Sequence, residues 1–265
     1  MSLGGFLGGS LYHILGYAGV FIAFAILSLL TLLLLYFFKE AQPVQRRNEG
    51  SYSLSLRLFL TTRRPLLTLV CNGLCDLLLV TLEPTLAIKL KTDFNLTHSS
   101  IGVYFFLNFL GGAISMGIAT YLPNSWDKRK FICPAMVLMA VFCLLVGPSS
   151  IFHMPKTPFI VGLGIFLTGG ARGVCMALCP ADAITGGIKR FPNDSTKVSD
   201  LVSSIYSFIF GVSCLIFPVI GSALAEHLGF RAAMDVVSGI LLITSTLYHT
   251  STIYDWISEQ KERNE

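Results

Sequence analysis

The sequence predicts an all-α integral membrane protein with seven transmembrane helices, and three observations support this prediction. Hydrophobic residues make up 53% of the 265 residues and charged residues only 13%. The mean hydropathy is +0.69, well above the range of water-soluble domains. Apolar runs of about 20 residues recur along the chain, which is the length a helix needs to cross a bilayer. The strands of a membrane barrel would be about half as long and would alternate in polarity.

The net charge and the cysteines indicate neither a nucleic-acid-binding protein nor a metalloprotein. The formal net charge is +4, and we interpret it as a property of the loops between the spans. The seven cysteines lack the Cys-x-x-Cys spacing of a zinc site. Cys71 and Cys75, like Cys175 and Cys179, share a helix face inside a predicted span. We therefore expect small packing residues there, with no metal and no cofactor.

The chain begins with a glycine-rich segment, residues 1–16, in which Gly4 and Gly8 have the GxxxG spacing of packed membrane helices. It has neither the basic start nor the small-residue cleavage site of a signal peptide. A first full span is predicted over Tyr17–Phe38, so that residues 1–38 form one unit. Residues 39–64 are expected to be a cytoplasmic basic linker, in which Ser51–Leu60 can form an amphipathic helix at the membrane surface.

Residues 65–252 are expected to form a unit of six further helices. A polar loop is expected over Gly186–Asp200, a break near Pro218, and a charged, frayed tail from Asp255 within a cytoplasmic segment 253–265. The six predicted spans are Pro65–Ile88, Ser100–Leu122, Phe131–Pro148, Phe159–Thr185, Leu201–Ala225 and Ala232–Tyr248.

Lysine and arginine are unevenly divided between the two sides of the membrane. Where connections alternate, one set holds fourteen of the nineteen basic residues and the other four, while Arg172 lies inside a span. Because basic residues gather in cytoplasmic loops, we expect Met1 outside and Glu265 in the cytoplasm. The sequon at Asn95 falls on the outer side, in agreement with this orientation.

The span Pro65–Ile88 carries two carboxylates, Asp76 and Glu83. Seven residues are nearly two helical turns, so both acids lie on one face, about 10 Å apart along the axis. A carboxylate at bilayer depth is costly and is a functional candidate by default. Pro84 removes a backbone donor beside Glu83, and the freed carbonyl would suit a cationic ligand. The alternative is a kinked helix with one acid paired inside the bundle and the other near the interface.

Arg172 lies near the middle of its span and needs a partner, because an unpaired guanidinium at that depth costs at least about 3 kcal/mol. Asp76 is our first choice for a structural charge pair with Arg172. An arginine facing a helix outside this chain is the alternative. If the pair forms, Glu83 is the acid left to bind a proton or a cation.

Other polar residues are weaker candidates. Asp182 is expected to have a helix-end or salt-bridge role ahead of one in substrate binding, and Asp235 to be solvated. Asn108 and Tyr206, together with neighbouring aromatic rings, can offer polar tips and ring faces to an amine, although aromatic residues at helical spacing are more often packing residues.

Four stretches resemble the major facilitator superfamily, specifically the vesicular amine transporter family and most closely its polyamine-transporter-like branch. The glycine-rich start through Gly16-Tyr17 resembles the end of the family's fifth helix and the start of its sixth. The acid-proline motif of Leu82–Leu86 resembles the signature of its seventh helix. Gly147–His153 resembles the connection after its ninth helix, and Gly211–Phe230 its eleventh helix with the Gly-Phe turn that follows. The basic turn Asp127–Lys130 also resembles the superfamily's loop between helices eight and nine, although its usual glycines are missing.

This resemblance implies that the seven spans correspond to helices six to twelve of a twelve-helix carrier, namely the C-terminal half plus the sixth helix. Such carriers place the substrate between two six-helix halves. The implied function is proton-coupled export or vesicular loading of organic cations such as polyamines, in a vesicular or other endomembrane, with the plasma membrane as the alternative. The lipid bilayer, protons, the organic cation and a missing N-terminal half or partner subunit are then the expected partners.

Two departures narrow the implied substrate. Monoamine-type members carry further acids in their tenth and eleventh helices, where this sequence has Cys175 and Ser207. This counts against an aromatic monoamine or acetylcholine, whereas Asp182 fits an acid of the polyamine-like branch. The alternative function is a non-transporting membrane subunit or degenerate relative that packs with partner proteins. No enzymatic motif is present, so an enzyme is not expected.

Overall fold

A computed structural model describes residues 2–37, 62–123 and 126–264. Its described residues are almost entirely helical, and all seven long helices are long and apolar enough to cross a membrane. This confirms the predicted fold class. The long helices are α1 (Ser2–Phe37), α3 (Arg63–Phe94), α4 (His98–Thr120), α5 (Arg129–Val146), α6 (Pro158–Arg190), α7 (Ser195–Leu228) and α8 (Phe230–Asn264), with one turn of 3₁₀ helix, η1 (Pro192–Asp194).

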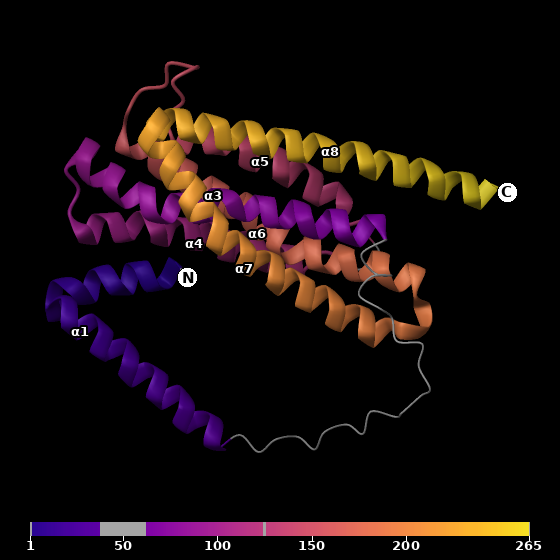
Figure 1. The fold of residues 1–265 in the computed structure, drawn as a ribbon, viewed down its shortest axis with the longest axis horizontal. Coiled ribbons are helices and arrows are strands. Elements are labelled where there is room, and N and C mark those ends of the chain that lie inside the picture. Colours follow the sequence, from indigo (N-terminus) through magenta and orange to yellow (C-terminus); the bar gives the residue numbers. More distant parts are fainter. Residues whose placement is uncertain (1, 38–61, 124–125, 265) are drawn as a thin grey trace.

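The helices from α3 to α8 run up and down in one bundle, with α6 in its middle (Figure 1). Helix α6 packs against α4, α5, α3 and α7, while α3 also packs against α7 and α8. The apolar core lies where α3, α5, α6 and α8 meet, and its fully buried side chains include Leu86, Met136, Met139, Cys175, Met234 and Leu241. The predicted packing role of the cysteines fits this position.

The contact between α4 and α6 is made by backbone atoms. A Cβ added at Gly169 would meet the backbone carbonyl of Asn108, and one added at Gly111 would meet that of Phe166. Small residues allow membrane helices to approach this closely, which replaces the missing hydrophobic driving force by van der Waals contact. The two helices therefore form one tightly packed pair.

Helix α1 consists of two helical parts joined at Gly16, whose φ of 68° and ψ of −177° lie outside the helical range. Only glycine adopts this conformation without strain. Helix α1 contacts α4, but its second part runs away from the bundle (Figure 1), and the window from Ile14 to Leu35 has no buried residues. The amphipathic helix predicted for 51–60 lies outside the described residues.

Several predicted helix ends and breaks were wrong. The expected polar loop over Gly186–Asp200 is mostly helical, since α6 continues to Arg190 and α7 begins at Ser195. The tail from Asp255 is not frayed but belongs to α8 as far as Asn264. Helix α7 is not broken at Pro218. Hydropathy reports only the part of a helix inside the bilayer, so polar turns that extend into water are missed.

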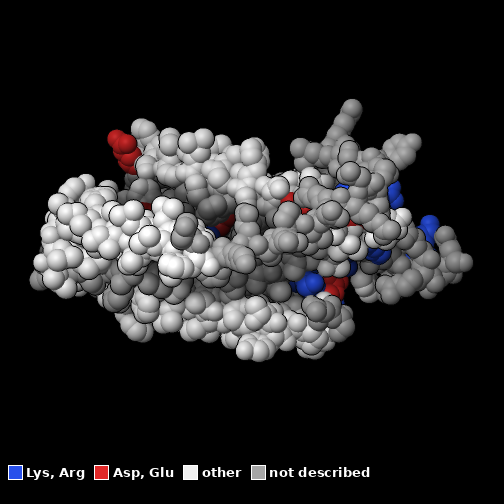
Figure 2. Space-filling view, turned by 90° about the horizontal axis from the view of Figure 1, so that it is seen from below, with Lys and Arg blue, Asp and Glu red and all other residues white. Residues whose placement is uncertain are grey.

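Charged residues are sparse on the face shown in Figure 2, and lysine and arginine gather toward its right-hand end. The up-and-down order of the helices brings the start of α3, the start of α7 and the ends of α6 and α8 to this same end (Figure 1). The uneven distribution of basic residues seen in the sequence is therefore a spatial property of the folded bundle.

Candidate functional site

An ion pair joins α3 to α6 near the middle of both helices. Nη2 and Nε of Arg172 donate hydrogen bonds to Oδ1 of Asp76, at 2.7 and 3.1 Å. The Asp76 side chain is 1% exposed and that of Arg172 is 14% exposed. The contact that we expected between these two residues is present, and it neutralises a charge that would otherwise be costly at this depth.

The pair leaves one carboxylate oxygen without a partner. Oδ2 of Asp76 is buried and accepts no hydrogen bond from any residue that the structure describes, and the same is true of Oδ1 of Asn72. Asn72 precedes Asp76 by four residues on α3, so the two side chains lie on one helix face, one turn apart. Tyr206 on α7, a predicted site residue, is half-buried and approaches both Asn72 and Asp76. Asp76 and Tyr206 are therefore brought together.

Arg172 lines a hollow of about 290 Å³ between α4, α6 and α7. Asn108 also lines it, but the amide nitrogen of Asn108 donates to the backbone carbonyl of Ile165 at 3.2 Å. The side-chain amide of Asn108, which was predicted to face an amine, thus links α4 to α6. The lining is otherwise apolar or glycine: Phe109, Gly112, Ala113, Met116, Gly169, Gly173, Met176 and Phe210.

Glu83 differs from Asp76 although both lie on the same helix. It is exposed, and it makes no ion pair or hydrogen bond with any residue that the structure describes. Helix α3 continues through Pro84 as a single helix, and the hydroxyl of Thr85 donates to the carbonyl of Thr81 at 2.7 Å. The bundle therefore covers this face of α3 at Asp76 and leaves it open at Glu83.

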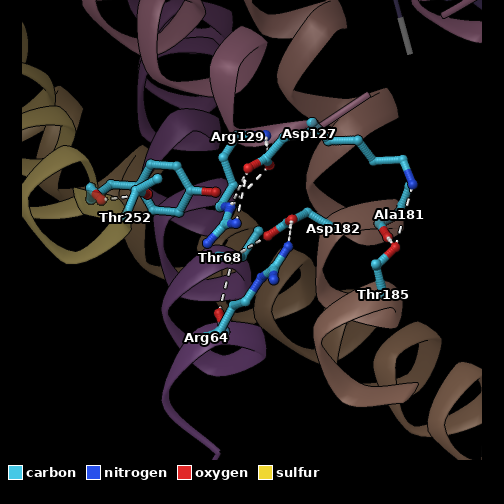
Figure 3. A network of polar contacts seen from close by, with 10 residues as sticks. Arg64, Thr68, Asp127, Arg129, Ala181, Asp182, Thr185 and Thr252 are labelled. Carbon is cyan, nitrogen blue, oxygen red and sulfur yellow. Dashed lines mark hydrogen bonds and ion pairs between the residues drawn. The ribbon is translucent and has the colours of Figure 1, made fainter. Parts of the chain in front are cut away.

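Asp182 belongs to a second ion pair between α3 and α6, at the end where α3 begins (Figure 3). Nη2 of Arg64 donates to Oδ1 of Asp182 at 2.5 Å, and the hydroxyl of Thr68 lies 3.1 Å from Oδ2 and 3.0 Å from the backbone carbonyl of Arg64, so these two acceptors share its one proton. Asp182 is 1% exposed. A Cβ at Gly186 would touch the aliphatic part of Arg64, so glycine makes room for this arginine. The arrangement favours the salt-bridge interpretation of Asp182.

The basic turn between α4 and α5 adds another ion pair at the end of the bundle where Arg64 and Asp182 lie. Arg129 donates to both carboxylate oxygens of Asp127, at 2.9 to 3.1 Å. Partial burial acts to raise the pKa of Asp127, but the hydrogen bonds from Arg129 outweigh it and hold this pKa below its usual value. Lys128 reaches the hydroxyl of Thr185 on α6 at 3.3 Å, so the turn is tied to the bundle.

The prediction for Asp235 was wrong. It is half-buried, and its Oδ2 accepts hydrogen bonds from the backbone nitrogen and the hydroxyl of Ser150. Nearby, Arg231 donates to the carbonyls of Pro148, Ser149 and Met154. The first turns of α8 therefore hold the loop between α5 and α6, which occupies a carboxylate that sequence position alone suggested was solvated.

Sequence reasoning missed three residues of these sites: Asn72, Arg64 and Thr68. The signal for Asn72 and Thr68 was available, since a polar residue four or eight positions from Asp76 shares its helix face. Arg64 gave no such signal, because it stands at the end of a basic linker and its partner is far away in the sequence.

An ion pair at mid-depth, a hollow beside it and a spanning helix with an exposed acid are features of secondary transporters among helical membrane proteins. The sequence model of the Major Facilitator Superfamily matches residues 1–186 and again residues 82–263. The chain belongs to this superfamily of membrane transporters.

Its similar relatives include the MFS-type transporter SLC18B1 of two mammals. The protein from Mus musculus is 25% identical over 254 residues, which cover 93% of this chain and 55% of the relative. The protein from Homo sapiens is 26% identical over 251 residues, covering 92% and 53%. This chain thus spans about half the length of these curated relatives.

Proposed function

We propose that this chain forms the C-terminal half of a proton-coupled carrier for organic cations such as polyamines, with Glu83 as its proton- and amine-binding acid. The single observation that carries the proposal is the exposure of Glu83 on a membrane-spanning helix. The carrier would export its substrate or load it into vesicles.

The position of Glu83 restricts what can lie against it. It is within about 7 Å of the midpoint of α3 along the helix axis, well inside a hydrocarbon core that is about 30 Å thick. A carboxylate at this depth does not face lipid, because the cost is several kcal/mol. The face of α3 that bears Glu83 would therefore meet water or protein, as in the space between the two halves of a carrier.

The pairing of the other mid-depth charges supports a cationic substrate. Arg172 is neutralised by Asp76, so the net charge left near the middle of α3 and α6 is the negative charge of Glu83. An ammonium group or a proton can each neutralise it, and the two compete for one carboxylate. Competition of this kind is what exchange of protons for cations requires.

The test needs a complete carrier, either the full-length product or this chain co-expressed with a complementing N-terminal half. In proteoliposomes with an acidic interior, Glu83→Gln should lower spermine uptake at least about tenfold, equivalent to roughly 1.4 kcal/mol. The substitution keeps the shape of the side chain and removes its titration. Protein level and membrane insertion should remain near those of the unmodified carrier.

Glu226→Gln is the matched control, because Glu226 is also an exposed acid but lies near the end of α7. Its uptake should be unchanged. Normal proton-driven uptake by the Glu83→Gln carrier would reject Glu83 as the coupling acid. A complex that forms with its partner but transports no organic cation would favour the non-transporting subunit.

A further inference from the structure

The two orphaned acceptors on α3 point to a proton-binding site that is separate from Glu83. We propose that Asp76 binds a proton on Oδ2, that Asn72 Oδ1 accepts the resulting hydrogen bond, and that protonation frees Arg172 from its counter-charge. This deepens the proposed function and rests on it for its role in transport. The binding of the proton itself is measurable without transport.

The first step of the argument is hydrogen-bonding capacity. Asp76 is 1% exposed and Asn72 is 2% exposed, and each has a buried oxygen with no partner. An ionised carboxylate and an amide oxygen are both acceptors, so they cannot bond to each other. A carboxylic acid has one O–H donor. One proton placed on Asp76 Oδ2 would make this oxygen a donor to the amide oxygen of Asn72, one helical turn away, and so give both oxygens a hydrogen bond.

The second step is that the number of free oxygens suits a proton better than a metal cation. Calcium and magnesium take about six or more oxygen ligands, and this site offers two free oxygens. The proton is transferred from hydronium in the aqueous phase: one O–H bond of H₃O⁺ breaks, one O–H bond forms at Oδ2, and a water molecule is released. Oδ1, which holds Arg172, keeps its hydrogen bonds to the guanidinium but loses most of its negative charge.

The third step concerns the groups that face Asp76. Helix α6 contributes Arg172 and Cys175, helix α7 contributes Tyr206 and Cys214, and Cys75 is its neighbour on α3. Thiols and phenols are ordinarily neutral at pH 7. Glu83, two turns further along α3, is a second acid whose charge acts on Arg172. Among the groups that face Asp76, Arg172 carries the fixed charge, so the protonation of Asp76 sets the charge of the pair.

The consequence for transport follows from the charge interaction between Arg172 and Glu83. With Asp76 ionised, the Arg172 pair is neutral and an organic cation can bind at Glu83. With Asp76 protonated, the guanidinium loses the counter-charge of its pair and repels a cation bound at Glu83. Asp76 thus acts on substrate release through Arg172, as a positioning residue for the step in which protons replace substrate.

Infrared spectroscopy of the 265-residue chain in lipid nanodiscs tests the proposal directly. The C=O stretch of a carboxylic acid is separate from the amide bands, and the difference between unmodified chain and Asp76→Asn isolates the contribution of Asp76. A carboxylic-acid band that titrates between about pH 4 and pH 9 is expected. Its complete absence in this range overturns the proposal.

Substitutions of Asn72 test the proposal through the direction in which they move the midpoint of the Asp76 titration. In Asn72→Leu the protonated acid loses its acceptor, so proton affinity should fall at least tenfold and the midpoint should move to lower pH. Asn72→Gln keeps an amide oxygen and should restore most of the affinity; Asn72→Ala replaces the leucine variant if that one does not fold. A midpoint that rises shows that the amide donates to the ionised carboxylate, and an unmoved midpoint shows no contact. Either result overturns the proposal.

Glu83→Gln separates this proposal from the one on function. If it abolishes coupled uptake and leaves the Asp76 band intact, both proposals stand. If uptake depends on Glu83 but no Asp76 band titrates, the inference on Asp76 fails alone. If the Asp76 band titrates as expected but Glu83→Gln leaves coupled uptake unchanged, the proposed function fails and the inference on Asp76 stands.

Discussion

The two ion pairs between α3 and α6 consist of the same residue types but are completed differently. At the end of the bundle, Asp182 has both oxygens occupied, one by Arg64 and one by Thr68. In the middle, Asp76 has one oxygen on Arg172 and the other without a partner. Both carboxylate oxygens of the first pair have a donor, whereas the second pair keeps free hydrogen-bonding capacity on its carboxylate, at a depth where such capacity is costly.

The difference matters because a buried ion pair is by itself weak evidence of stability. The desolvation of two charges offsets much of their attraction, unless further hydrogen bonds complete the site. The Asp182 pair meets this condition and the Asp76 pair does not. The hydrogen bonds around Asp76 therefore do less to offset desolvation than those around Asp182.

The largest expected effect is at the central pair. Arg172→Asp and Asp76→Arg should each destabilise the protein by about 3–5 kcal/mol, since each leaves buried charges without a counter-charge. The double exchange should recover a part of this loss. Folded yield in detergent, measured by fluorescence-detected size exclusion, and unfolding by denaturant would give both values. Failure of the double variant to recover any yield would show that Arg172 depends on another partner.

A smaller effect is expected at the end of the bundle. Arg64→Met should cost about 2 kcal/mol, the value of a hydrogen bond to a charged group. Asp182 keeps its contact with Thr68 in this variant, which lessens the cost of leaving its carboxylate without Arg64. Lys89→Met breaks the partly exposed pair of Lys89 with Asp93 and should cost less than about 0.5 kcal/mol. A cost at Arg64 equal to that at Arg172 would remove the distinction between the two pairs.

The smallest effect isolates the hydrogen bond that completes the end pair. Thr68→Val keeps the side-chain shape and removes a hydroxyl that contacts both Asp182 and the carbonyl of Arg64 on its own helix. It should lower the free energy of unfolding by about 1.5 kcal/mol. Thr85→Val removes a hydroxyl that bonds only to its own helix and should change stability by a few tenths of that. The same denaturant series measures both variants, and equal losses would mean that Thr68 contributes nothing specific to Asp182.

The sequence predicted the apolar, membrane-spanning parts of the helices well and their polar ends poorly. All seven spans follow from apolar runs of sufficient length, and the contact of Arg172 with Asp76 follows from the cost of a lone central charge. Helix ends such as Gly186–Arg190 and Asp255–Asn264 were missed, because they are polar and lie beyond the reach of a hydropathy argument.

The remaining site residues depend on which helices are neighbours. Arg64 and Asp182 are 118 positions apart, and no local pattern joins them. Asp235 was taken for a solvated acid because its contact with Ser150 requires the fold of the loop after α5. Glu83 was recognised as a candidate from its acid-proline motif, but its exposure beside the buried Asp76 could be known only from the packing of α3.

The close approach of α4 to α6 has a mechanical consequence for the central pair. Gly111, Gly169 and Gly173 place backbone against backbone, whereas α3 meets α7 where Gly73 and Gly221 face the side chains of Ile209 and Thr81. Side chains can rotate to new positions and backbone carbonyls in a helix cannot. Arg172 is thus carried by a rigid pair of helices, and a movement of the backbone that bears Asp76 relative to the backbone that bears Arg172 would be a displacement of α3. Two conformations of this protein would superpose on α4 and α6 and differ in the position of α3.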